Sequence, residues 1–358
     1  MTATLQTTNI QNATSSTTNL ALDTSGNVTV GSSLTAANNI TATSGTVVMA
    51  SSFLRNRIIN GAMQIAQRGT SATVTAGTSV PTASAGFPCV DRWFVYSTGA
   101  NVTAAQVAGS GNNKNLLQIT GAASVTAVGV GQRIEQLNSY DLAGQTCTLS
   151  VLLANSTLTT VTWTASYANT ADTFGTIGTP TKTQIATGTF TVSSTLTQYT
   201  VNIAVPSAAT TGIEILFTVG AQTSGTWSIG NVQFEPGSVA TPFERRQYGQ
   251  ELALCQRYYE IGGAGSIGRV QGSSTAQGFG YQFKVTKRTA PTLALTTTSP
   301  SIAEISISGR SGSGSTLTVY SGPTVSGASD NYITGFSSMS PPNMVVMTSD
   351  SFSVSAEL

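Results

Sequence analysis

The sequence predicts an all-β protein built around a β-sandwich, and three observations support this fold class. Between residues 51 and 245, polar and apolar residues alternate in short runs bounded by Gly, Pro, Asn or Ser. Apolar residues at helical spacing are absent from that region. Charged residues make up only 8% of the 358 residues, while Ser and Thr together exceed a quarter. These features favour an exposed β structure over an enzyme fold built on parallel strands.

Residues 1–50 are predicted to be an attachment segment that does not fold alone. Asp23 is its only ionisable side chain, and Thr, Ser, Asn, Ala and Gly dominate. Short alternations at Leu20–Leu22 and Val28–Val30 indicate strands that bury little apolar area. We therefore expect partner chains to cover this segment, or the segment to remain a flexible tail. The heptads of a coiled coil are missing.

The sandwich is expected over residues 51–245, with strands that have one core face and one solvated face. In the strand predicted at Thr160–Tyr167, Trp163 and Tyr167 share one face by alternation. Glu214 lies between two isoleucines and is expected to face solvent by the same rule. The other clear strands are Cys147–Leu153, Phe190–Val192, Gln198–Val205 and Ile213–Val219.

A short connecting helix is expected after the sandwich, over roughly residues 246–259 of a segment that spans 246–261. Four side chains recur at helical spacing and form one apolar stripe, and a Gly-Gly pair ends the helix. The stripe could dock against its own sandwich or form a seam around a trimer axis. It consists of Tyr248, Leu252, Cys255 and Tyr259.

Residues 262–358 are expected to form a second β domain at the tip of the chain. Its predicted strands are Gly278–Val285, Thr292–Leu295, Ile302–Ser308, Ser315–Tyr320, Tyr332–Phe336, Met344–Met347 and Ser351–Ser355. The predicted loops Ser308–Ser315 and Ser321–Asp330 are rich in Gly and Ser, and loops on a rigid scaffold commonly carry recognition residues. The candidate receptor-binding residues in or near these loops are Arg310, Tyr320, Asp330 and Tyr332.

Several blocks of sequence resemble segments that recur in bacteriophage tail-fibre and related tail proteins, many of them from marine or cyanobacterial hosts. These blocks are Asn56–Thr70, Asp91–Phe94, Trp227–Tyr259, Phe283–Thr292 and Ser355–Leu358. The resemblance implies a jelly-roll sandwich similar to carbohydrate-binding modules. It also implies a homotrimer whose N-terminal segment docks on phage baseplate or tail proteins and whose C-terminal β tip contacts the host surface.

Charge and residue types argue against several other functions. With 15 basic and 14 acidic side chains, the net charge of +1 gives no field that would attract nucleic acid. Histidine is absent, so Ser-His-Asp and Cys-His relays cannot form. No spacing typical of a zinc or calcium site occurs, and neither a metal nor a cofactor is predicted. No apolar run reaches the roughly 18 residues of a membrane helix, so membrane insertion is not expected.

The three cysteines, Cys89, Cys147 and Cys255, lie far apart and are expected to be buried free thiols. The first residues lack a signal-peptide pattern. This combination predicts folding in a reducing host cytoplasm and release by lysis as part of a virion tail. Asp91 stands beside Arg92 and is expected to form an ion pair or cap a turn.

Trp163 and Tyr167 are the sandwich candidates for sugar stacking, although burial is the stronger interpretation for all three tryptophans. The predicted function is that of a phage tail fibre that attaches to a host-surface glycan, without enzymatic activity. Weak contacts would be multiplied by avidity. One alternative is a purely structural baseplate or tail-tip component. Another is a glycan-cleaving tailspike, which would need two carboxylates about 5 to 9 Å apart; the sequence does not identify such a pair.

Overall fold

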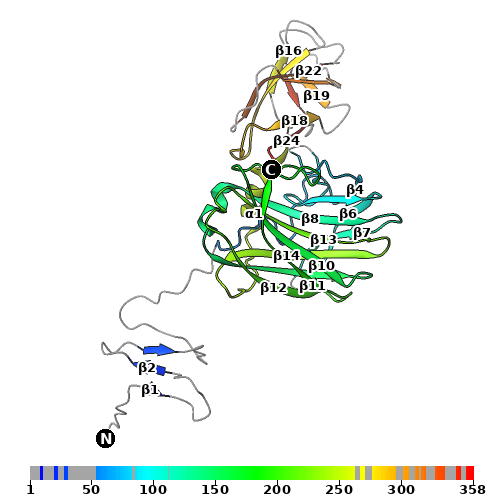
Figure 1. Cartoon of the computed structure of the whole chain (residues 1–358). Helices are drawn as coiled ribbons and strands as arrows, with labels where there is room; N and C mark the ends of the chain where they lie inside the picture. The colour runs from blue at the N-terminus through cyan, green and yellow to red at the C-terminus, as the bar shows by residue number, and fades with distance from the viewer. Residues whose placement is uncertain are drawn as a thin grey trace. The chain divides into compact units, whose positions relative to one another are not determined.

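The computed structural model divides the chain into two compact units, residues 1–50 and 51–358 (Figure 1). It describes residues 54–82, 85–111, 113–262, 281–294 and 352–358 with their side chains, and elsewhere only the backbone of individual strands. In the first unit, β2 lies between β1 and β3 in an antiparallel sheet. The bounds are β1 Asn9–Ile10, β2 Leu20–Leu22 and β3 Val28–Val30, and the latter two match the predicted strands.

The second unit contains the predicted β-sandwich, which confirms the all-β fold class. One sheet has five strands in the order β11-β10-β13-β8-β5, and the other has six in the order β12-β9-β14-β7-β6-β4. The bounds are β4 Ser71–Val74, β5 Phe94–Thr98, β6 Val102–Ala108, β7 Asn115–Thr120, β8 Ala127–Ile134, β9 Thr146–Asn155, β10 Thr160–Ala168, β11 Lys182–Thr191, β12 Thr197–Ala204, β13 Ile213–Val219 and β14 Thr226–Pro236. Two short 3-10 helices, η1 Gln136–Asn138 and η2 Tyr140–Leu142, connect β8 to β9.

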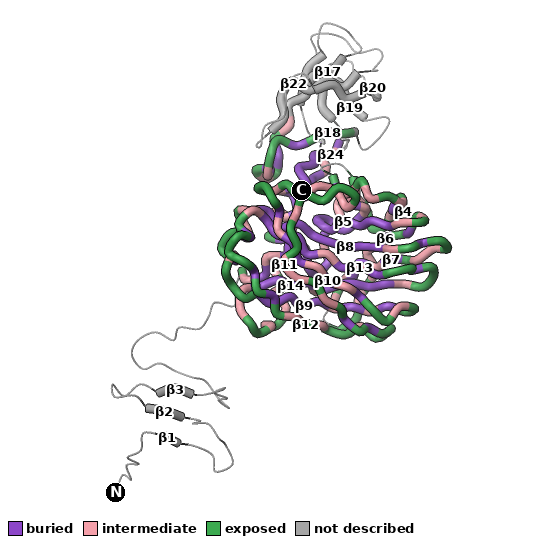
Figure 2. The backbone as a smooth tube through the Cα atoms, in the orientation of Figure 1, coloured by how far each residue is buried: buried purple, intermediate pink, exposed green. Residues whose placement is uncertain are grey.

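The apolar core lies between the two sheets, and buried residues run along their strands (Figure 2). Trp93 and Trp227 are fully buried, as the sequence predicts. Burying an indole contributes several kilocalories per mole to folding because it removes a large apolar surface from water. All three cysteines are buried free thiols, which also agrees with the sequence prediction.

A bulge in β14 brings the start of the sandwich against its last strand. The pairing of β14 with β9 shifts register between Gly230 and Gln233. Val232, within the bulge, donates its backbone N–H to the carbonyl of Gly61 at 3.0 Å. A side chain at Gly61 would place its Cβ 2.1 Å from the Val232 oxygen, so this contact requires glycine.

The helix α1 spans Tyr248–Gln256 and is shorter than expected, because Tyr259 already begins a strand, β15 (Tyr259–Gly262). This strand pairs with β24 (Phe352–Ser355), which also pairs with β18 (Thr292–Leu295). A separate seven-stranded sheet has the order β20-β19-β23-β16-β17-β22-β21. Its bounds are β16 Ile267–Val270, β17 Ala276–Gln282, β19 Ser301–Ile305, β20 Ser311–Ser313, β21 Thr316–Val319, β22 Gly327–Thr334 and β23 Met344–Met347.

Within the described residues, no helix combines the length and the apolar character needed to cross a membrane.

Candidate functional site

The residues predicted at the tip are placed only in part. Arg310 and Tyr320 lie outside the described residues. Asp330 and Tyr332 belong to β22, where Tyr332 pairs with Gly278 on one side and Thr318 on the other. They therefore occupy a strand inside a sheet, whereas the sequence predicted a loop around Asp330.

Trp163 is a core residue. Only 6% of its surface is exposed, and its ring centroid lies 6.4 Å from that of Phe190. Phe190 in turn lies 5.3 Å from Tyr199, so Phe190 of the edge strand β11 contacts one ring of its own sheet and one ring of the edge strand β12 in the other sheet. Tyr167 is half-buried and packs against the same core. Trp163 is therefore too buried to stack on a sugar, whereas Tyr167 stays a predicted candidate.

The predicted helix stripe is divided between solvent and the protein's own core. Tyr248 is 60% exposed, while Cys255 is fully buried and Leu252 packs against the same small cluster. Tyr259 is buried in β15, with the Arg68 guanidinium 3.5 Å from its ring centroid. Cys255, Leu252 and Tyr259 thus pack within their own chain, which leaves Tyr248 as the exposed member of the stripe.

Four of the blocks that resemble phage tail proteins meet at one place, which we call the junction: Asn56–Thr70, Asp91–Phe94, Trp227–Tyr259 and Ser355–Leu358. Buried Asn60 connects three of them. The Asn60 side-chain amide donates to the backbone carbonyl of Asp91 at 3.0 Å. The backbone carbonyl of Asn60 accepts a hydrogen bond from the Trp93 indole N–H at 3.1 Å. Its backbone N–H donates to Glu251 of α1 at 2.5 Å. Such a buried network fixes the relative positions of the segments that it joins.

Buried charges complete the junction. Asp91 forms an ion pair, as expected, but its partner is Arg68 at 3.6 Å and not the adjacent Arg92, and it also accepts hydrogen bonds from Gln67. Arg92 instead pairs with Glu357, from the last residues of the chain. Burial raises the pKa of Asp91 to about 6, against the lowering effects of Arg68 and Gln67.

Glu214 is buried, although the alternation in β13 predicted that it faces solvent. Arg133, from the neighbouring strand β8, donates to it at 2.9 Å, and Lys182 forms a second ion pair. The Glu214 carboxylate can be buried here because two cations, Arg133 and Lys182, pair with it and offset its charge.

A groove crosses the outer face of the six-stranded sheet, with a volume of about 300 Å³. Its floor follows one cross-strand row, in which Ser228 of β14 stands opposite Gln118 of β7 and Ala154 of β9. The Gln118 amide donates to the Ser228 hydroxyl at 3.2 Å. The polar lining residues are Ser110, Gln118, Ser156, Ser194, Thr226 and Ser228.

The groove is uncharged, since no ionisable side chain is among the described residues that line it. Hydroxyl and amide groups can both donate and accept hydrogen bonds, so they can match the hydroxyls of a neutral polyhydroxylated ligand. The apolar lining residues are small or aliphatic, namely Ala108, Leu116, Ala154 and Leu196. Binding here would rest on hydrogen bonds and shape rather than on aromatic stacking.

The groove was not predicted from the sequence. Gln118 stands between Leu117 and Ile119, and Ser228 stands between Trp227 and Ile229, so alternation does indicate that both side chains point outward. Which strands lie side by side, and in what register, could not be read from the sequence.

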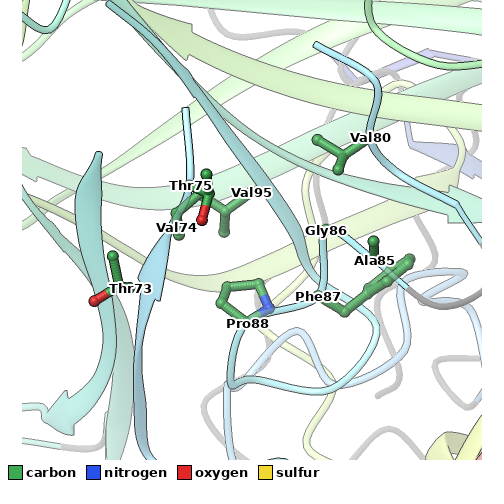
Figure 3. A pocket seen from close by; sticks show the side chains of 9 residues that line it. All are labelled: Thr73, Val74, Thr75, Val80, Ala85, Gly86, Phe87, Pro88 and Val95. Atoms are coloured by element: carbon green, nitrogen blue, oxygen red, sulfur yellow. The ribbon is translucent and has the colours of Figure 1, made fainter. Parts of the chain in front are cut away.

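A second cavity, of about 240 Å³, opens between the edge strands β4 and β5 (Figure 3). Its walls are mixed, with Thr73, Val74 and Val95 on the strands and Phe87 and Pro88 on the segment between them. Titratable side chains are absent from its described lining, so it offers no acid–base chemistry.

No group of three or more potential metal ligands of the His, Cys, Asp and Glu types occurs among the described residues. Two further buried carboxylates are paired with cations. Glu235 lies 3.5 Å from Arg55, and Glu135 lies 2.9 Å from Arg257. These carboxylates serve as structural ion pairs in this arrangement.

Neither a protein-family model nor a curated protein matches the sequence. Among solved structures, the chain is similar to CBM4 at 15% identity, covering 50% of this chain and 98% of that one, with a TM-score of 0.33. A family 11 carbohydrate-binding module from Clostridium thermocellum, in complex with a mixed-linked tetrasaccharide, gives 12% identity, 48% and 99% coverage and a TM-score of 0.29. The enzymatically active domain of bacteriophage CBA120 tailspike protein 4 gives 20% identity, 45% and 21% coverage and a TM-score of 0.31. At TM-scores below 0.5, these similarities assign neither a family nor a ligand to the chain.

Proposed function

We propose that the chain is a bacteriophage tail-fibre protein that attaches the virion to a host-surface glycan, and that the groove on the six-stranded sheet binds the glycan. The observation that carries the binding proposal is the uncharged lining of hydroxyl and amide groups. A neutral saccharide offers the same kind of groups in return, and an uncharged groove does not have to desolvate ions when it binds one.

The phage assignment is supported by the sequence blocks and by their packing. Four blocks that resemble tail-fibre segments, far apart in the chain, meet at the junction, where Asn60 of the first block contacts two of the others. This supports a shared architecture over a chance likeness of separate motifs.

The mechanism is adhesion without turnover. Each groove would bind weakly, because hydrogen bonds to a saccharide replace hydrogen bonds to water. A homotrimer docked on the tail through residues 1–50 would present three grooves, and several fibres would add to the avidity. Additional contacts to the host are still predicted for four tip residues, Arg310, Tyr320, Asp330 and Tyr332.

A glycan-array experiment on the full-length protein tests this function. Gln118→Ala removes an amide from the groove, and Ser228→Tyr fills the groove. Gln198→Ala is the matched control, because Gln198 is an exposed glutamine of β12 on the same sheet that does not line the groove. Gln118→Ala should weaken glycan binding by up to about tenfold and Ser228→Tyr should abolish it, while the control binds normally.

Three outcomes would contradict the proposal. Equal binding by Gln118→Ala and Gln198→Ala would exclude the groove as the site. Failure of the unaltered protein to bind any glycan would favour a purely structural tail component. Shortening of a bound glycan with time would identify a tailspike enzyme.

A further inference from the structure

Four arginines from separate parts of the chain converge on its last residues. The Arg288 guanidinium donates to the carbonyls of Ala356 and Glu357 at 3.0 and 3.1 Å. Arg133 donates to the main-chain oxygen of Leu358 at 2.9 Å. These contacts are made to the backbone of residues 356–358 and so do not depend on its side chains.

The Glu357 side chain receives the other two arginines. It pairs with Arg92 and accepts a hydrogen bond from Arg68 at 3.0 Å. Each of these guanidinium groups also lies 3.5 Å from the centroid of a tyrosine ring, Arg92 over Tyr258 and Arg68 over Tyr259. The tyrosines hold the arginines in place by packing and by cation–π attraction.

Glu357 is needed to balance the charge at this place. Arg92 is 1% exposed and Arg68 is largely buried, and a buried cation without a partner is strongly unfavourable. Asp91 contacts Arg68 only at 3.6 Å, and its own pKa is raised by burial. With Glu357 removed, Arg92 would therefore lose its carboxylate partner inside the protein.

The segment 352–358 also has the form of a bound extended peptide. Its strand β24 lies between β15 and β18 and pairs with both. Beyond the strand, Ala356 donates its N–H to the Tyr258 carbonyl at 2.7 Å. Its buried apolar side chains are Phe352, Val354, Ala356 and Leu358. Pairing on both edges and alternate buried side chains are the features of peptide recognition by strand addition.

We infer that Arg68, Arg92, Arg133 and Arg288 form a peptide-recognition socket whose ligand is the chain's own segment 352–358, selected by Glu357. Residues 263–351 separate β15 from this segment in the sequence, and we call them the excursion. Because β24 pairs with β15, the socket holds the end of the excursion next to its beginning. Recognition at the socket, rather than chain continuity, keeps the segment bound. This inference does not depend on glycan binding.

The test separates the segment from the chain after folding. A protease recognition sequence flanked by glycines is inserted between residues 349 and 350 of the full-length protein, which is purified and then cleaved. The released piece carries the segment 352–358. We expect it to remain bound through gel filtration, as measured by mass spectrometry of the protein peak.

Exchange with synthetic peptides then measures selectivity, without any variant that might fail to fold. A fluorescent peptide of residues 352–358 should replace the cleaved piece. The same peptide with Glu357→Gln should bind on the order of 100-fold more weakly, because it leaves Arg92 without a carboxylate. A Ser353→Ala peptide is the matched control and should bind within about threefold of the native one, since the Ser353 hydroxyl makes a long 3.4 Å bond to the Ala294 carbonyl.

Two results would overturn the inference. Loss of the cleaved piece during gel filtration would mean that chain continuity holds the segment. Equal affinity of the native and Glu357→Gln peptides for the socket would mean that the arginines do not select the acidic side chain.

Discussion

Arg92 illustrates how a single buried ion can determine where a segment docks. Burial lowers the pKa of this guanidinium, but Glu357, Tyr258 and Cys255 together raise it by more, so Arg92 keeps its charge inside the protein. A buried ion pair of this kind adds little net stability compared with an apolar pair, yet breaking it is costly. We therefore expect its role at the junction to be specificity for the native register of this segment.

Asp91 should make the stability of the protein depend on pH. Burial raises its pKa from the ordinary 3.8 to about 6, so the folded state holds the proton more tightly than the unfolded state. The corresponding stability is present below pH 3.8 and is lost as the pH rises to about 6, by at most roughly 3 kcal/mol. Asp91→Asn cannot titrate, so the stability difference between the two proteins should shift by that amount between pH 4 and 7. Urea unfolding across this range measures it, and parallel profiles would disprove it.

Tyr258 should contribute through its ring and not through its hydroxyl. The hydroxyl oxygen is buried without a hydrogen-bond partner among the described residues, whereas the ring lies against Arg92. Tyr258→Phe should therefore change the free energy of unfolding by less than about 0.5 kcal/mol. Tyr258→Leu, which removes the aromatic face, should cost about 2 kcal/mol. Chemical denaturation of the pair decides the matter, and equal losses would refute the role of the ring.

At the scale of elements, strands with strong alternation could be predicted from sequence nearly to the residue. Ile213–Val219 and Thr292–Leu295 have the predicted bounds, because period-two alternation and flanking turn residues are local signals. The helix was predicted too long, because Tyr259 satisfies helical spacing but pairs with Ser355 as a strand. That partner lies almost a hundred residues away, beyond the reach of local pattern.

The candidate site was less predictable, for the same reason. Alternation predicted that Glu214 faces solvent. The side chains of Arg133 and Lys182, from other strands, form ion pairs with it and allow its burial. The groove likewise needs the register that sets Gln118 opposite Ser228. Tertiary pairing decides both outcomes, and one sequence does not reveal it.

Strand β14 should be the element whose core face matters most to the sandwich. Its Trp227 is fully buried, and the indole N–H has no hydrogen-bond partner among the described residues. Trp227→Ala should cost about 3 to 5 kcal/mol through the cavity that it leaves. Trp227→Phe keeps most of the packing and loses only an unpaired donor, so it should cost about 1 kcal/mol. Thermal unfolding and soluble yield report the difference, and similar losses for both variants would contradict it.

At the scale of the whole molecule, the topology makes residues 263–351 an excursion with adjacent ends. Gly262 of β15 pairs with Phe352 of β24, so the chain leaves and returns at one place. A module attached in this way can change without disturbing the sandwich, because both its ends are fixed by the junction. The proposed glycan binding by the groove and the proposed host contacts of the module would then be able to vary independently.

Replacement of two segments of this module should lower host adsorption while leaving glycan binding by the groove intact. Strand β20 (Ser311–Ser313) pairs with β19, and strand β22, which begins at Gly327, pairs with β17 and β21. To leave these strands intact, the replacements are confined to residues 306–310 and 320–326. These segments include Arg310 and Tyr320. Removing them should reduce adsorption to host cells by at least about tenfold, because a few side chains usually carry most of the binding energy of an interface.

The control is the groove variant Ser228→Tyr, which should lower both glycan-array binding and adsorption. Light scattering of each variant should return the mass of the predicted trimer, so that a loss of adsorption reflects contacts and not assembly. Normal adsorption by both replacement variants, together with its loss in Ser228→Tyr, would place receptor binding in the sandwich alone. In that case the excursion would serve some purpose other than contact with the host, and Arg310 and Tyr320 would no longer be candidates.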